Sequence, residues 1–310
     1  MPLPIRSVLV ATDLSDSSDE VLRAAAQIAS LAGADLHAVH VEPAEVTFLG
    51  VIESAPEIQE RLDRARGALA AQLERVGIEQ TVASARLEVN SAHRGIYERA
   101  HEVSADLIVL GPHRHRPLPE RPLGTTADRL IRTSDVPCLI VRHPINLPLR
   151  KVLVATDLSH PAQLAMNEAF TWAAALGVPP RSDEREPTTV VVAYVVPLRA
   201  EVARSFVSLD FYREQLMEQI GIARQKVPPE VPVKVQPEIL QNVSPVEEIL
   251  RLASADVDLL VLGTHGRGAL ARALIGSVSS AVVRQAECPV LLVPPILDVR
   301  PSQARPSAGD

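Results

Sequence analysis

The sequence predicts two consecutive α/β domains, each a parallel β-sheet with helices on both faces. Three observations lead to this fold class. The chain has 310 residues, the length of about two domains; the same landmarks occur twice in the same order; and short apolar runs alternate with helical patterns in each copy. Hydrophobic residues are 46% and charged residues 22% of the chain, so a wholly disordered protein is excluded.

The internal repeat defines the domains. Its landmarks are residues 8–15 and 152–159, which are identical, residues 90–111 and 242–263, and residues 136–141 and 288–293. The offset between copies grows from 144 to 152 residues, which predicts an insertion in the second copy. We expect a surface loop at Gly177–Thr189, because prolines and charges are frequent there. The predicted domains are 1–147 and 148–298, followed by a disordered tail at 299–310.

Five short apolar runs in each copy predict β-strands. The expected strands are Val8–Ala11, Leu36–Val41, Val82–Val89, Leu107–Leu110 and Cys138–Val141, then Val152–Ala155, Val190–Val196, Val233–Leu240, Leu259–Leu262 and Val290–Val293. Between them apolar residues recur at helical spacing, as at Val21, Ala25 and Ile28. The third strands are more polar, as at a sheet edge, whereas the other strands indicate a sheet covered on both faces. We also expect the final strands to pair antiparallel between the copies, mimicking a two-fold dimer.

The loops after the strands predict where a ligand binds. In doubly wound sheets, ligands bind beyond the carboxyl ends of the strands, where the strand order reverses. The loops at Asp13 and Asp157 follow the first strands, and those at Gly111 and Gly263 follow the fourth strands. The sequence therefore predicts one ligand crevice in each domain.

The second copy has a glycine pattern that is typical of a phosphate cradle. After Gly263 the spacing is G-x2-G-x9-G-S, and the last two residues, Gly276 and Ser277, open the helical stretch Val278–Gln285. Glycines let the backbone approach a ligand closely, and the free N–H groups of a helix start suit an anion. The alternative is that these glycines serve only turns and a helix start.

Together with Val-x-x-Asp-x-Ser in the first strand and the closing Cys-Pro-Val-Leu-Leu-Val strand, this loop resembles the universal stress protein family in its tandem-domain form. The resemblance covers the chain to about Val299. It implies Rossmann-like domains of the adenine nucleotide alpha hydrolase type, with five parallel strands in the order 3-2-1-4-5. It also implies bound ATP, held by the glycine loop and by the ends of the first two strands.

The resemblance assigns site residues in the second domain. Ala155, Thr156 and Asp157 would lie beside adenine and ribose, and Val195 would present its backbone to the adenine edge. Ribose and phosphates would be held by Gly263, Gly266, Gly276 and Ser277, with Thr264, His265, Arg267, Gly268, Val278 and Ser279 adjacent. Asp157 is also a candidate to hold Mg²⁺ through ATP, or to cap the first helix of the domain.

The first copy departs from the pattern. It keeps Gly111 and the pair Gly124-Thr125, but Arg114 stands at the second glycine position, and four prolines remove N–H donors from the loop. We therefore expect ATP in the second domain and weak or no binding in the first. The alternative is that Arg114, Arg116 and Arg121 replace the amide contacts by charge.

Other nucleotide and metal motifs are less well supported. No G-x-x-x-x-G-K-[S/T] occurs, which excludes a P-loop ATPase. The stretch from Gly266 to Ala271 matches the dinucleotide pattern G-x-G-x-x-[G/A], but it follows the fourth strand and lacks the acidic residue that such a site needs. His113 and His115 could hold a metal, although no further ligand motif completes that site. We expect no dedicated catalytic residues, and ATP hydrolysis that is slow at most.

Composition bounds the partners and the location. The net charge is −7, and neither half has the basic character that nucleic-acid binding requires. The longest apolar run, within Val190–Leu198, is shorter than the ~20 residues of a membrane helix. Cys138 and Cys288 indicate buried thiols in a reducing compartment, so we expect a cytoplasmic protein. The leading hypothesis is an ATP-dependent stress-response module that acts on an unknown regulatory partner and could form a homodimer. The alternatives are a slow ATPase or adenylate-transferring enzyme, and an assembly scaffold.

Overall fold

Strands and helices alternate through both copies. The structure, a computed structural model, describes residues 5–43, 55–112, 123–179, 186–197, 209–254, 256–265 and 275–295. The first half contains β1 (Ser7–Thr12), α1 (Ser18–Ala32), β2 (Asp35–Glu42), α2 (Ala55–Val76), β3 (Val82–Val89), α3 (Ala92–Glu102), β4 (Leu107–Leu110), α4 (Thr125–Thr133) and β5 (Cys138–Ile140). The second half contains β6 (Lys151–Thr156), α5 (His160–Leu176), β7 (Thr188–Pro197), α6 (Leu209–Arg224), β8 (Val233–Asn242), α7 (Pro245–Ala253), β9 (Leu259–Gly263), α8 (Ser277–Gln285) and β10 (Val290–Val293).

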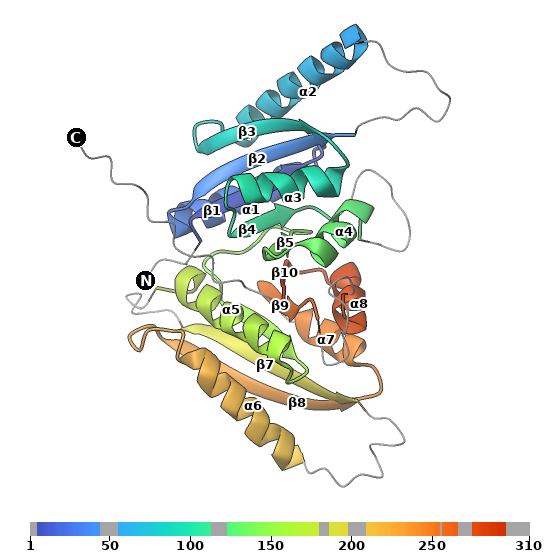
Figure 1. The fold of residues 1–310 in the computed structure, drawn as a ribbon. Helices are drawn as coiled ribbons and strands as arrows, with labels where there is room; N and C mark the ends of the chain where they lie inside the picture. The colour runs from blue at the N-terminus through green and yellow to red at the C-terminus, as the bar shows by residue number, and fades with distance from the viewer. Residues whose placement is uncertain are drawn as a thin grey trace, which may run out of the picture.

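The strands form one ten-stranded sheet. Its order is β3-β2-β1-β4-β5-β10-β9-β6-β7-β8, so each half has its third strand at an outer edge and its fifth strand at the centre (Figure 1). Pairing is parallel within each half, whereas β5 and β10 pair antiparallel, with Leu139 opposite Leu291. The predicted antiparallel pairing of the final strands is therefore confirmed, and the two halves share a continuous sheet.

Helices cover both faces of this sheet. The helices α1, α2, α5 and α6 pack on one face and α3, α4, α7 and α8 on the other (Figure 1). Successive strand residues alternate between the two layers: Val8 and Val10 belong to the first core, and Leu9 belongs to the second. Each core contains residues from both halves, which explains why the inner strands are apolar along their whole length.

The loop expected at Gly177–Thr189 ends earlier than the sequence indicated, because β7 already begins at Thr188. The Thr188 side chain is buried, where its hydroxyl donates to the Leu149 carbonyl at 2.7 Å and accepts the Val178 N–H at 2.9 Å. These two hydrogen bonds satisfy a polar group that the composition alone places in a loop. Residues 180–185 of the predicted loop lie outside the described residues.

A charged cluster joins the halves beside the central strands. The carboxylate of Asp128, on α4, pairs with Arg132 of the same helix at 2.8 Å and with Arg284 of α8 at 3.1 Å. The two arginines occupy equivalent positions in the two copies, so a single carboxylate serves both. The guanidinium of Arg142 also donates to the carbonyl of Val283, at 3.0 Å, near the end of α8. The last turn of α8 is thus held by side chains of the first half.

Within the part of the chain that the structure describes, no helix combines the length and the apolar character needed to cross a membrane.

Candidate functional site

The repeated Thr-Asp-Leu-Ser sequence forms the same turn after β1 and after β6. In the second half the Thr156 hydroxyl accepts the N–H of Leu158, and the Asp157 carboxylate accepts the N–H of Ser159, both at 3.0 Å. Leu158 has a φ of 63° and its counterpart Leu14 a φ of 65°. A left-handed backbone is unusual for leucine, and strained residues of this kind cluster at ligand sites.

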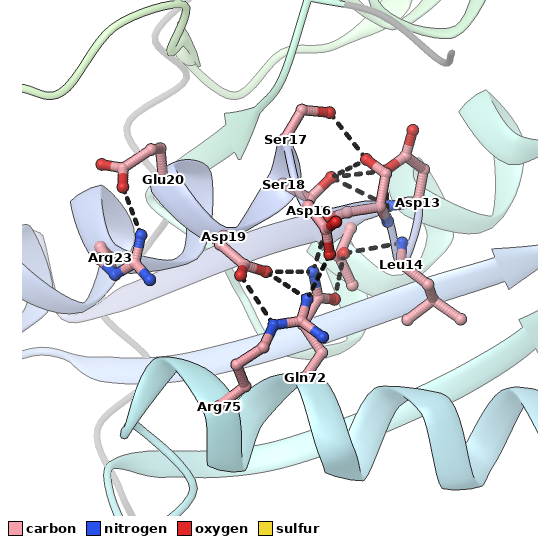
Figure 2. Close-up of polar contacts among 12 residues, drawn as sticks. Asp13, Leu14, Asp16, Ser17, Ser18, Asp19, Glu20, Arg23, Gln72 and Arg75 are labelled. Atoms are coloured by element: carbon pink, nitrogen blue, oxygen red, sulfur yellow. Dashed lines mark hydrogen bonds and ion pairs between the residues drawn. The ribbon is translucent and has the colours of Figure 1, made fainter.

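The same turn leads into the first helix of each half. Ser159 caps α5, because its hydroxyl accepts the N–H of Ala162 at 3.3 Å. The helix-capping role considered for Asp157 therefore belongs to Ser159, while the Asp157 carboxylate holds the turn. In the first half, Oδ1 of Asp13 accepts the N–H of Ser15 at 3.1 Å and the hydroxyl of Ser18 at 2.6 Å (Figure 2).

The two ends of the glycine loop meet in the second half. The N–H of Gly276 donates to the carbonyl of Thr264 at 2.7 Å, and the hydroxyl of Ser279 donates to the carbonyl of Gly263 at 2.6 Å. These bonds bring the start of α8 against the end of β9. Gly276 is the N-cap of α8 and has no side chain to bind the first free amides of the helix. The amino end of α8 thus has the character of an anion site.

Gly263 stands where a larger residue would be crowded. A Cβ atom there would lie 3.3 Å from the carbonyl oxygen of Pro161, at the start of α5. Beyond it, Nδ1 of His265 lies 2.8 Å from the Thr264 hydroxyl, and Nε2 of His265 is buried with no hydrogen-bond partner among the described residues. The end of β9 is therefore packed closely against the amino end of α5.

The described site residues gather at one edge of the sheet. Ala155, Thr156 and Asp157 end β6, Val195 lies near the end of β7, Gly263, Thr264 and His265 end β9, and Gly276, Ser277, Val278 and Ser279 begin α8. Because β6 lies between β7 and β9, these ends are adjacent. Ala155 and Val195 are buried, whereas Asp157 is partly exposed. Three predicted site residues, Gly266, Arg267 and Gly268, lie outside the described residues.

The first half has a well-defined cavity at the corresponding place. The cavity has a volume of about 230 Å³ and is bounded by the ends of β1, β2 and β4 and by the starts of α3 and α4. The loop closure is the same as in the second half, since the N–H of Gly124 donates to the Pro112 carbonyl at 2.7 Å. Ala127 stands at the position of Ser279. The sequence predicted a crevice in this half from the loops at Asp13 and Gly111, and both residues line the cavity; the apolar residues that bound it were not identified from the sequence.

The polar side chains that link the end of the first strand to its neighbouring helices differ between the halves. In the first half, the Thr12 hydroxyl donates to Gln72, whose amide donates to Asp19, and Arg75 forms two hydrogen bonds with the Asp19 carboxylate (Figure 2). The Arg75 hydrogen bonds lower the pKa of Asp19 below its usual value. In the second half, Gln163 stands in place of Asp19, so the residue at this position carries no charge. The spacing of residues in the sequence does not predict these hydrogen bonds, because they join residues that are far apart in the chain.

Metal ligands are not clustered in the described residues, where no group of three or more histidine, cysteine and acidic side chains could hold an ion. His113 and His115, considered as metal ligands from the sequence, lie outside the described residues, as do Arg114, Arg116 and Arg121. A role for these five residues stays a prediction.

The sequence matches one protein family over both halves. The model of the universal stress protein family matches residues 4–142 and 148–294. A universal stress protein of Mycolicibacterium smegmatis is 27% identical over 301 residues, which cover 93% of this chain and 97% of that protein. A universal stress protein of Mycobacterium tuberculosis is 29% identical over 200 residues, so the match spans 61% of this chain and 61% of that relative's length.

Solved structures show the same fold. A universal stress protein from Archaeoglobus fulgidus superposes with a TM-score of 0.65 at 19% identity, covering 93% of this chain and 96% of that chain. A structure described as a putative universal stress protein from Pseudomonas aeruginosa gives a TM-score of 0.64, also at 19% identity, and covers 94% of both chains. These identities support the fold alone, while the family match extends over nearly the whole sequence. The chain therefore belongs to the universal stress protein family, as a tandem of two family domains.

Proposed function

We propose that this protein is a nucleotide-dependent regulatory module of the stress response and that it binds ATP mainly in its second half. The observation that carries the proposal is the hydrogen bond between Gly276 and Thr264, which sets the uncapped start of α8 beside the end of β9. A triphosphate at this place would meet amide N–H groups and the positive end of a helix dipole. The loop residues Gly266, Arg267 and Gly268 would complete the cradle.

The residues near the start of α8 have the chemical character that an adenine nucleotide requires. The buried Ala155 and Val195 offer apolar surface for a base, and the Asp157 carboxylate offers an acceptor for ribose hydroxyl groups. The same carboxylate would share a Mg²⁺ ion with the phosphate oxygens, because hard cations prefer oxygen ligands. The Ser159 N–H orients Asp157 for either role.

Regulation, rather than rapid chemistry, is the proposed use of the bound nucleotide. ATP occupancy would change the surface that this end of the second half offers to a regulatory protein. We propose that turnover is slow at most and that the protein works in the cytoplasm. Both cysteines are free and buried, as expected for a reducing compartment. A homodimer would be compatible with this role.

Mass spectrometry of the nucleotide released from purified protein tests the proposal. We expect ATP from the wild type and from Gly124→Val, which alters the equivalent glycine of the first half, and its loss from Gly276→Val. Circular dichroism should show that both variants are folded. ADP with measurable turnover would instead favour a slow ATPase or adenylate-transferring enzyme. Release of no nucleotide, with no thermal shift on adding ATP, would contradict the proposal and leave the assembly scaffold.

A further inference from the structure

The outer strand of the first half, β3, has one edge that pairs with no other strand in the part of the chain that the structure describes. It is the last strand of the sheet and pairs with β2 alone (Figure 1). The N–H of Asn90, just after β3, donates to the carbonyl of Glu42 on β2 at 3.1 Å. Because successive residues of a strand direct their amide groups to opposite edges, those of Ala85, Leu87 and Val89 face outward.

The other outer strand, β8, carries a proline at the equivalent place. The N–H of Thr189 on β7 donates to the carbonyl of Arg150 at 2.8 Å, so Val192, three residues later, directs its amide groups toward β8. Val192 lies opposite Pro237, and the hydrogen bonds of a parallel pair reach the residues on either side of the opposite one. Pro237 therefore faces the outer edge, where a missing N–H discourages pairing with another chain. Ala85 has the same register position in the first half.

The charges of β3 form a pattern that is its own complement. Arg86 and Glu88 lie on the same face of the strand, with Nη1 and Oε1 3.7 Å apart. If two copies of β3 pair antiparallel with Leu87 opposite Leu87, Arg86 of each copy stands opposite Glu88 of the other. The outward amide groups of Ala85 then meet those of Val89, as antiparallel hydrogen bonding requires. Moving the centre by one residue would instead place two arginines or two glutamates opposite each other.

The same register covers an apolar side chain. Val89 is 47% exposed, and in the paired strands it would pack against Ala85 and Leu87 of the other copy. The chain already contains a contact of this type, since β5 and β10 pair antiparallel and join the two halves.

We propose that β3 is a self-association edge, through which two copies of this chain pair antiparallel about Leu87. The partner is a second copy because the strand complements its own charges in this register. The sheet would continue from one copy into the other, while Pro237 keeps the opposite edge free. This inference does not depend on nucleotide binding in either half.

Sedimentation velocity of the full chain from ~1 to ~500 µM tests the association. We expect a monomer–dimer equilibrium with a dissociation constant on the order of 100 µM, because one pair of strands buries less area than a standard interface. Residue-resolved hydrogen exchange on the same samples should show that protection of the amides of Ala85, Leu87 and Val89 increases with protein concentration. Protection that is independent of concentration would show that another segment of the chain covers this edge, and it would contradict the proposal.

Ala85→Pro gives β3 the proline that β8 has at the same register position. The equivalent Pro237 shows that the fold accepts proline there, and circular dichroism should confirm that the variant is folded. Loss of an outward N–H and the bulk of the ring should weaken dimerisation at least about tenfold.

An exchange of charges tests the register. Arg86→Glu and Glu88→Arg each place like charges opposite each other, so each variant alone should associate at least about tenfold more weakly than the wild type. An equimolar mixture of the two should dimerise again, because every charge then meets its opposite. The mixture also controls for the ion pair of Arg86 with Glu102 in its own chain.

Arg213→Glu is the matched control, because Arg213 is exposed on α6 of the second half and the variant should dimerise as the wild type does. A wild type that stays monomeric at ~500 µM would overturn the proposal. Unchanged affinity of Ala85→Pro, or a mixture of the charge variants that stays monomeric, would overturn it equally.

Discussion

We predict that the ionised side chain of Glu168 lowers the free energy of unfolding at neutral pH. Its carboxyl group lies on α5, one turn before Trp172, whose side chain forms a hydrogen bond with it. Burial raises the pKa of Glu168 from 4.5 to about 6, because the ionised form loses hydration. The folded state therefore holds its proton more tightly than the unfolded chain does. The stabilisation by the protonated group is complete below pH 4.5 and is lost as the pH rises through 6.

The size of the effect follows from the shift in pKa. A difference of about 1.5 units corresponds to about 2 kcal/mol of unfolding free energy at pH 8. Glu168→Gln keeps an oxygen that can accept the Trp172 hydrogen bond and removes the charge. It should raise the free energy of unfolding by about 1–2 kcal/mol at pH 8 and change it little at pH 4.

Urea denaturation at the two pH values measures this difference, with the fluorescence of Trp172, the single tryptophan of the chain, as the signal. The emission of the native protein should also titrate near pH 6 in the wild type and lose that transition in Glu168→Gln. Glu218→Gln is the control, since Glu218 is exposed on α6. An equal gain at pH 4 and pH 8, or no gain at pH 8, would refute the reasoning.

Two further predictions concern the Asp128 contact between the two halves and the packing of two glycines in the first half. Asp128→Asn should lower the free energy of unfolding by about 1–2 kcal/mol, because two arginines lose a charged partner. Arg132 and Arg284 lower the pKa of Asp128 below its usual value. Thermal unfolding should therefore show the difference between wild type and variant at pH 7, and a smaller difference as the pH falls through that pKa. Gly95→Ala should destabilise by about 1–2 kcal/mol, because its Cβ would lie 2.9 Å from Val41 Cγ1, whereas Gly67→Ala, in the exposed face of α2 with no neighbour within 4 Å, should stabilise by about 0.5–1 kcal/mol. Equal urea midpoints for the two glycine variants would contradict this packing argument.

Strands were the most predictable part of the structure. The expected Val82–Val89, Leu107–Leu110 and Val290–Val293 have the observed bounds, and the other strands differ by a few residues at their ends. Buried parallel strands are apolar along their length, so their signal is strong in a single sequence. The error at Thr188 arose because a threonine was assigned by composition, although its hydroxyl is satisfied inside the fold.

Side-chain contacts between distant residues were much less predictable. The pairing of Asp128 with Arg284 joins residues that are 156 positions apart, and no spacing rule connects them. The cavity of the first half depends likewise on where Val39, Ile96 and Thr125 meet in space. The repeated turn was visible as an identical sequence, but the left-handed backbone of Leu14 and Leu158 was not.

The antiparallel junction of β5 and β10 has an evolutionary consequence. In a dimer of identical chains, a substitution in one subunit is necessarily present in the other, so both ligand sites change together. Here the two halves are encoded separately and stay joined through the junction, so each can change alone. Asp128 with Ser280 at the equivalent position, and Ala127 with Ser279, are such one-sided changes. Covalent linkage thus allows one half of the sheet to change its sequence while the other half keeps its own.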